Sequence, residues 1–306
     1  MKSLDFKQFF RFVEIETKLA TMLPFFAALA YVFYTTGSIN IQSSIIYFVA
    51  ALFLDMSVTA INNHLDKRED KSQTPHYSNG VSLVIIGTML LVFSILGLYL
   101  VYLHGITILL AGAFCLLIGV TYTFGPAPIS KTTYGELLSG FTVGSVVMFI
   151  VVSINNADFQ PLGLAFDMSE LRLSMDIDLV GIAAFTLVTL PAAFTAANIM
   201  LANNICDAER DRPFRYTLVH HLGTKRALYL FAGLYCCAYL SIIVASILGI
   251  VPLWCLLVLI TLPLVHKNIC SFFKEQEKST TFLLSIKNFV IIMMVYIVGI
   301  MLGGVI

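Results

Sequence analysis

Long apolar stretches dominate the chain, and short polar segments separate them. An α-helix needs about 20 residues to cross a bilayer core, and most of the stretches approach that length. The pattern predicts nine spans, near residues 17–35, 41–62, 81–103, 106–122, 135–154, 179–202, 227–248, 251–265 and 282–306, of which the eighth is the shortest. We therefore predict an all-α polytopic membrane protein, a bundle of nine transmembrane helices forming one domain over residues 1–306.

The composition agrees with this fold class. The chain is 58% hydrophobic and 12% charged, with a mean hydropathy of +0.90, whereas about a quarter of the residues of soluble proteins are charged. The six cysteines have no C-x-x-C spacing, so neither a disulfide framework nor a zinc site is predicted. The formal net charge is zero, and we expect no nucleic-acid partner.

Basic residues predict the orientation, because lysine and arginine in short loops tend to remain in the cytoplasm. With a cytoplasmic N-terminus and nine spans, Arg172 is the only one of the 18 lysine and arginine residues that falls outside. Adding or removing one span would destroy this asymmetry. We predict a multi-pass protein of the cell membrane with its N-terminus in the cytoplasm and its C-terminus outside.

Two polar segments share one pattern, Asn-x-x-x-Asp-x-x-x-Asp. They are INNHLDKRED at 61–70 and ANNICDAERD at 202–211, at the ends of the second and sixth spans. Positions i, i+4 and i+8 lie on one side of a helix, so each set can converge; the sets are Asn62, Asp66 and Asp70, and Asn203, Asp207 and Asp211. They offer hard oxygen ligands, which suit Mg²⁺. The motif-bearing loops, about 62–80 and 203–226, would both face the cytoplasm.

Basic residues surround both motifs, which indicates an anionic guest. They are Lys67, Arg68, Lys71, Arg210, Arg212 and Arg215. Mg²⁺ together with a diphosphate would satisfy both signs of charge. A single motif of this kind is more often a solvated helix end, but two copies at matching places argue against coincidence and indicate two pseudo-repeats.

The two motifs and the nine spans resemble the UbiA superfamily of intramembrane prenyltransferases over essentially the whole chain. The resemblance implies a UbiA-type bundle with a central cavity, in which the six motif residues hold Mg²⁺ and the diphosphate of a prenyl donor. It assigns catalytic roles to Asp66, Asp70, Asp207 and Asp211. YTFGP at 122–126 and NNICDAERDRPFRYTLVHHLG at 203–223 resemble the 1,4-dihydroxy-2-naphthoate prenyltransferases of menaquinone synthesis.

The resemblance implies a reaction. A polyprenyl group would pass from an allylic diphosphate to 1,4-dihydroxy-2-naphthoate, giving demethylmenaquinone, pyrophosphate and CO₂ within the lipid bilayer. Two departures leave the acceptor open. Those relatives usually carry Arg-Pro where this chain reads ETKLATMLP at 16–24, and their Lys-Arg-Thr-Leu is RYTL at 215–218. Another aromatic acceptor such as 4-hydroxybenzoate is the alternative; a transporter is more remote, because its ion sites would usually lie at the bilayer midplane.

Further site residues follow from position. Tyr122 and Lys131 are candidates to contact the diphosphate or flank the allylic cation, with helix-end packing as the alternative. Arg68, Arg210 and Arg212 would bind the substrate or serve only as cytoplasmic charges. Asp55 lies two turns before Asn62, and an acid within a span is a functional candidate, although it could instead tie helices together. Lys18 would orient the acceptor's carboxylate or hydroxyls.

Overall fold

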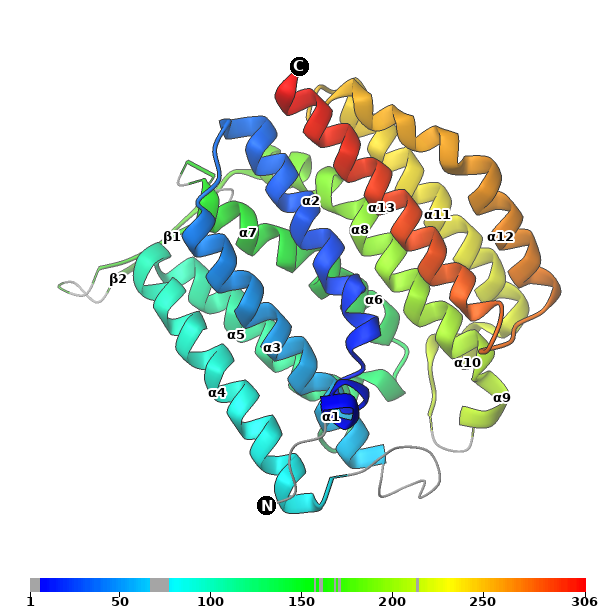
Figure 1. Cartoon of the computed structure of the whole chain (residues 1–306). Helices are drawn as coiled ribbons and strands as arrows, with labels where there is room; N and C mark the ends of the chain where they lie inside the picture. The colour runs from blue at the N-terminus through cyan, green and yellow to red at the C-terminus, as the bar shows by residue number, and fades with distance from the viewer. Residues whose placement is uncertain are drawn as a thin grey trace.

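The computed structural model describes residues 6–66, 77–156, 158–159, 162–167, 169, 172–212 and 215–306. Its elements form a helical bundle (Figure 1). In chain order they are α1 (Phe6–Phe12), η1 (Ile15–Lys18), α2 (Leu19–Thr36), α3 (Ile41–Asp66), α4 (Asn79–His104), α5 (Ile106–Thr123), η2 (Ile129–Lys131), α6 (Gly135–Gly140), η3 (Phe141–Val146), α7 (Val147–Asn155), β1 (Leu162–Asp167), β2 (Arg172–Ile177), α8 (Leu179–Cys206), α9 (Ala208–Asp211), α10 (Leu218–Leu222), α11 (Thr224–Ile247), η4 (Leu253–Thr261), α12 (Leu262–Lys274) and α13 (Phe282–Val305).

Each predicted span coincides with helical structure, and the all-α class is confirmed. Within the described residues, eight helical segments are long and apolar enough to cross a membrane, while Ala20–Thr36 in α2 is apolar but shorter. The fifth span, Gly135–Asn155, joins α6, the π-helical η3 and α7. The predicted eighth span is longer than expected, because η4 and α12 continue as one segment from Leu253 to Lys274.

Glycines allow the tight connections between spans. Only Gly105 separates α4 from α5, and its φ of +87° is a conformation that residues with a Cβ rarely adopt. Gly37 ends α2 with a φ of +69°, and its N–H donates to the Phe33 carbonyl. These short reversals keep consecutive spans antiparallel neighbours.

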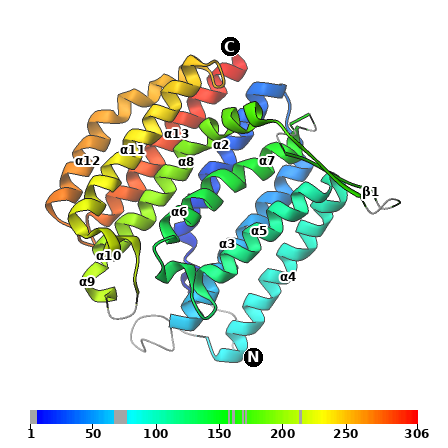
Figure 2. The same cartoon turned by 180° about the vertical axis from the view of Figure 1, so that it is seen from behind.

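The spans form two groups. Figure 2 shows α3, α4 and α5 on one side, and α8, α11, α12 and α13 on the other, with α2 and the α6–α7 segment between them. Both α3 and α8 end at the same end of the bundle, near α1, α9 and α10 (Figures 1 and 2). We call this the motif-bearing end; α13 ends at the opposite end.

Small residues bring the fifth span into close contact with α8. A Cβ added at Gly144 would lie 2.3 Å from the Ala193 backbone nitrogen, and one at Gly140 would lie 2.7 Å from the Ala197 Cβ. Glycine and alanine at such spacing let helix backbones approach closely in membranes. The contact therefore fixes how α6 sits against the second motif-bearing helix.

The segment between α7 and α8 contains a β-hairpin. Strands β1 and β2 pair antiparallel, with Leu162 opposite Ile177 and Asp167 opposite Arg172. The hairpin lies at the end of the bundle opposite the motifs (Figure 1). Arg172, the single basic residue predicted on that side, is exposed there.

Replacing Gly144 with valine should destabilise the bundle. The side chain would meet Ala193 backbone atoms, which cannot give way as a flexible side chain could, and overpacking costs about 1–3 kcal/mol. We expect a lower apparent melting temperature of the purified protein in detergent. Gly97→Val in α4 is the matched control, because no atom lies within 4 Å of a Cβ built there; equal losses in both variants would contradict the packing argument.

Candidate functional site

The second motif extends through the end of α8 into α9. Asn203 lies in the last turn of α8, Asp207 caps the helix, and the Asp211 N–H donates to the Asp207 carbonyl at 2.8 Å. The spacing of four residues is therefore kept across the break between the helices. Asp207 is 5% exposed, so its carboxylate lies within the motif-bearing end.

Basic side chains converge on the two aspartates. Asp207 accepts from Lys278 Nζ at 2.5 Å and pairs with Arg210 Nη2 at 2.9 Å. Asp211 lies 3.5 Å from Arg210 Nε and 3.6 Å from Arg215 Nε. Lys278 comes from the connection between α12 and α13, far from the motif in sequence. The site thus combines carboxylates with basic side chains, and two of these, Arg210 and Lys278, are exposed enough to contact an anion.

The first motif is described only in part. Asn62 lies in the last turns of α3, and Asp66 is the final residue of that helix. Asp70 and Arg68 lie outside the described residues. Because α3 and α8 end at the same end of the bundle, the structure brings the two motif-bearing helix ends to one side (Figure 2).

The second asparagine of each Asn-Asn pair contacts a glutamate near the start of the preceding span. Asn63 Nδ2 donates to Glu14 Oε1 at 3.1 Å and to the Phe12 carbonyl at 3.0 Å. Asn204 Nδ2 donates to Glu136 Oε1 at 2.8 Å. We call each of these contacts an asparagine bracket. Both brackets tie a motif-bearing helix to the span before it.

A histidine fixes the segment after the second motif. His220 Nε2 donates to the Ala208 carbonyl at 2.8 Å, since Nδ1 accepts the Thr217 N–H at 3.2 Å. The contact joins α10 to the start of α9, directly after Asp207. His220 therefore positions the motif, a role that the spacing of the histidines did not suggest.

Tyr122 and Lys131 lie close to the start of α6. A methyl group at Gly135 would be 3.6 Å from the Tyr122 hydroxyl oxygen. The Lys131 carbonyl accepts the Tyr216 N–H at 3.1 Å, which joins η2 to the chain that follows the second motif. Arg212 is exposed just after α9. These candidates gather around the same end of the bundle.

Lys18, at the end of η1, is buried and pairs with Asp55 of α3, which is a quarter exposed. Lys18 Nζ donates to Asp55 Oδ1 at 2.9 Å and to Thr59 Oγ1 at 2.6 Å, and its side chain is 2% exposed. Thr21 Oγ1 donates to Asp55 Oδ2 at 2.6 Å. The contacts of this pair tie the first span to the second.

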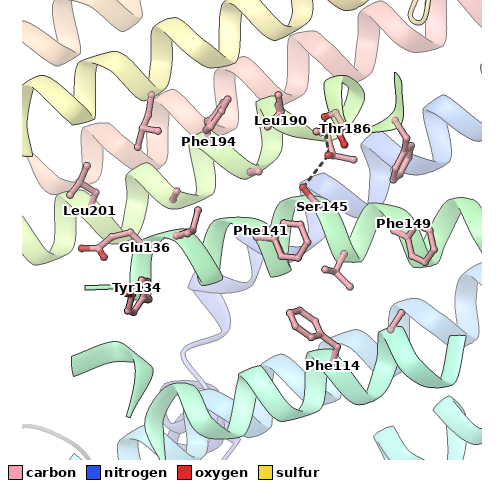
Figure 3. A pocket seen from close by; sticks show the side chains of 18 of the residues that line it. Phe114, Tyr134, Glu136, Phe141, Ser145, Phe149, Thr186, Leu190, Phe194 and Leu201 are labelled. Atoms are coloured by element: carbon pink, nitrogen blue, oxygen red, sulfur yellow. Dashed lines mark hydrogen bonds between the residues drawn. The ribbon is translucent and has the colours of Figure 1, made fainter. Parts of the chain in front are cut away.

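A cavity of about 880 Å³ lies between α5, the α6–α7 segment, α8 and α11. Figure 3 shows phenylalanines along it and Glu136 towards the motif-bearing end. Its lining is mostly apolar and includes Phe114, Phe141, Phe149, Phe185, Phe194 and Leu201. The lining residues Leu110 and Leu137 lie within spans and are exposed, so the cavity opens on the lateral surface of the bundle. Its size fits a ligand pocket.

One of the two predicted sets of metal-binding oxygen donors lies wholly within the described residues. Asn203, Asp207 and Asp211 offer hard oxygen donors of the kind that Mg²⁺ binds. No group of three or more His, Cys, Asp or Glu side chains in the described part of the chain is arranged to hold a metal. The donor set fits Mg²⁺ in chemistry, and carboxylates of the first motif would be needed to complete it.

Sequence reasoning missed Glu136, Asn204 and Lys278. The repeated Asn-Asn was visible in the sequence, but it gave no indication that its second residue contacts a glutamate, 49 residues away in the first copy and 68 residues away in the second. Lys278 lies 71 residues from Asp207, and no motif connects the two positions. Only the packing of the spans brings these groups together.

Comparisons with known proteins agree with this architecture. The model of the UbiA prenyltransferase family matches residues 21–296. The chain is 31% identical over 170 residues to the 1,4-dihydroxy-2-naphthoate octaprenyltransferase of Bacillus subtilis (strain 168). That match covers 55% of this chain and 48% of the relative, so it spans about half the length of the curated protein.

Solved structures share the fold. A UbiA homologue from Archaeoglobus fulgidus bound to GPP and Mg²⁺ superposes with a TM-score of 0.64 at 14% identity, covering 98% of this chain and all of that chain. The apo structure of a UbiA homologue from Aeropyrum pernix K1 gives a TM-score of 0.66 at 18% identity, covering 92% of this chain and 98% of that one.

Replacing Asp55 with asparagine should destabilise the protein through Lys18. The ammonium group would lose its charged partner while remaining buried. Breaking a fully buried pair costs about 3–5 kcal/mol, and the partial exposure of Asp55 places the expected loss below that range. We expect a clear fall in apparent melting temperature in detergent, and adding Lys18→Met should cause little further loss. Lys267→Met, at an exposed position, is the control. Additive losses in the Lys18/Asp55 double variant would argue against the pair.

Proposed function

Because the chain belongs to the UbiA prenyltransferase family, we propose that it transfers a polyprenyl group from an allylic diphosphate to 1,4-dihydroxy-2-naphthoate. The products would be pyrophosphate, CO₂ and the quinol form of demethylmenaquinone. The observation that carries the choice of acceptor is the similarity to the Bacillus subtilis naphthoate octaprenyltransferase. Eight membrane-capable helices in the described residues and the family make the protein a multi-pass membrane protein.

The donor diphosphate would bind at the motif-bearing end. The oxygen donors of both motifs would hold Mg²⁺ between them. These donors are Asn62, Asp66 and Asp70 of the first motif and Asn203, Asp207 and Asp211 of the second. When bound, Mg²⁺ would supply positive charge that stabilises the departing pyrophosphate. The bound donor would thus lie with its charged head at the helix ends and its chain within the bundle.

The basic side chains would contact the diphosphate oxygens directly. Lys278 and Arg210 already approach Asp207, and Arg212 is exposed nearby. Positive groups placed where negative charge develops lower the barrier to breaking the allylic C–O bond. Lys131 and Tyr122 would flank the same position.

The lateral cavity would exclude water from the reacting carbon. An allylic cation that meets water is lost as an alcohol, and an apolar lining limits that side reaction. The electron pair of the broken C–O bond leaves with pyrophosphate, and a ring carbon of the acceptor forms the new C–C bond. The carboxylate then leaves as CO₂, returning its electron pair to the ring.

The motif-bearing end would face the cytoplasm. Nearly all basic residues of the sequence are predicted on that side, and basic loops tend to remain there. The hairpin with Arg172 would then lie outside, with the C-terminus.

Asp207→Asn should lower the turnover rate sharply. It removes a charged metal ligand while keeping the size of the side chain, and losing one well-placed electrostatic contact costs a factor of about 10²–10³ in rate. The measurement is mass analysis of products formed in detergent from Mg²⁺, farnesyl or geranylgeranyl diphosphate, and either 1,4-dihydroxy-2-naphthoate or 4-hydroxybenzoate.

Wild-type protein in the same assay tests the acceptor. Product from the naphthoate alone supports the proposed function, whereas product from the benzoate alone moves the protein to a different branch of the family. Asp158→Asn, in the segment between α7 and β1 at the opposite end, should retain wild-type activity. An undiminished rate in Asp207→Asn would contradict the metal–diphosphate site.

Lys278→Met should weaken binding of the donor. Lys278 lies 2.5 Å from Asp207 and is half exposed, so it can contact a diphosphate at the motif. Loss of one charge-assisted contact corresponds to about a tenfold higher dissociation constant. Titration calorimetry with farnesyl diphosphate and Mg²⁺ measures this effect. Lys274→Met, at the exposed end of α12, is the control; unchanged or tighter binding in Lys278→Met would rule out the contact.

A further inference from the structure

We propose that Glu136 binds the 4-hydroxyl group of the aromatic acceptor and thereby orients its ring in the lateral cavity. This inference rests on the function proposed above. It assigns a substrate-specificity role to a residue outside both Asp-rich motifs.

Glu136 is a buried acid, and only one of its two carboxyl oxygens has a hydrogen-bond partner among the described residues. Its side chain is 3% exposed, and Oε1 accepts from Asn204 Nδ2 at 2.8 Å. Oε2 is buried and has no hydrogen-bond partner among the residues that the structure describes. A buried oxygen without a partner costs about 1–3 kcal/mol, so a ligand that donates one hydrogen bond there would recover that cost.

Glu136 lines the cavity at one end. Figure 3 shows it beside Leu201 and far from Phe149. Several hydroxyl groups farther along the lining already have partners: Ser145 Oγ bonds Thr189 Oγ1 at 3.0 Å, and Thr186 Oγ1 donates to its own helix at 2.7 Å. Among the described residues that line the cavity, Glu136 is the only acid, so it is the strongest hydrogen-bond acceptor available to orient a ligand.

The other asparagine bracket shows that tying helices together does not require a buried acid. Glu14 accepts from Asn63 in the same way as Glu136 accepts from Asn204. Glu14, however, is exposed to solvent. The contact with Asn204 therefore does not by itself explain why a carboxyl group is buried against an apolar cavity. A hydrogen bond from a ligand to Oε2 would explain it.

The acceptor has the chemistry that this end of the cavity would bind. Its flat ring is apolar and fits a lining that includes Phe114 and Phe141, whose rings lie 6.2 Å apart and nearly perpendicular. Its 1-hydroxyl group is adjacent to the carboxylate and is engaged by an internal hydrogen bond. The 4-hydroxyl group is free to donate. Glu136 Oε2, which is buried and lacks a partner among the described residues, would accept it once the carboxyl group turns towards the cavity.

The bracket places this contact near the donor site. Asn204 precedes Asp207 by three residues, a rise of about 4.5 Å along a helix. A ring held at Glu136 would therefore lie within about one helical turn of the level at which the diphosphate is bound. Glu136 can thus hold the acceptor beside the allylic carbon without contacting the diphosphate.

Glu136→Gln tests the contact with little change in shape. The amide oxygen can keep the hydrogen bond from Asn204, while an NH₂ group that donates replaces Oε2. We expect the dissociation constant of 1,4-dihydroxy-2-naphthoate, measured by titration calorimetry, to rise about tenfold. Binding of farnesyl diphosphate with Mg²⁺ should change less than about twofold.

Two comparisons separate ligand binding from a purely structural role. The analogue 1-hydroxy-2-naphthoate lacks the 4-hydroxyl group, so its affinity should be the same in the wild type and in Glu136→Gln. Glu14→Gln makes the same change in the other bracket, whose glutamate is exposed, and should leave the dissociation constants of both naphthoates unchanged. Equal weakening of both naphthoates by Glu136→Gln, or no weakening of either, would overturn the inference while leaving the proposed function intact.

A failure of the proposed function would look different. It would appear in the wild type, as turnover of 4-hydroxybenzoate without turnover of the naphthoate. The same variants titrated with 4-hydroxybenzoate would then decide the role of Glu136. A tenfold loss in Glu136→Gln alone would support a hydroxyl contact, and an unchanged constant would exclude it.

Discussion

The close approach of the fifth span to α8 is the contact on which the site depends. Gly140 and Gly144 pack directly on the backbone near Ala193 and Ala197. In lipid the hydrophobic effect does not drive helices to associate, so small residues and interhelical hydrogen bonds determine which helix surfaces meet. This contact sets the depth of α6 beside α8. Glu136 thereby reaches the end of the helix that carries Asp207.

In both halves of the bundle, a hydrogen bond to a glutamate holds the end of the motif-bearing helix. Each motif-bearing helix ends in polar groups whose orientation must be fixed. Asn204 contacts a glutamate of the preceding span, and Asn63 contacts one in the segment that leads into the preceding span. On the second helix, Lys278 and His220 add contacts from later segments. The acidic end is therefore held by links to several parts of the chain, which restricts its movement before any ligand binds.

Hydropathy predicted the spans well, because the bilayer imposes both length and composition on each helix. Helix ends were harder to predict: α8 continues to Cys206 since Asn203 and Asn204 remain within the helix despite their polarity. The repeated motif indicated the candidate residues on α8 and α9, where Asp207 and Asp211 pair with basic side chains. Glu136 and Lys278 were not predicted. The packing of helices brings them to the motif, and such packing leaves no spacing pattern in the sequence.

The lateral opening of the cavity has a consequence for kinetics. If a long-chain donor enters from the hydrocarbon phase, the rate at which it meets the protein depends on its mole fraction in the lipid. Its concentration in bulk water does not affect that rate. Added phospholipid or detergent would dilute such a donor at constant total amount. The donor concentration that half-saturates the protein should therefore be expressed as a surface concentration in the lipid. The composition of the surrounding bilayer then affects the measured rate.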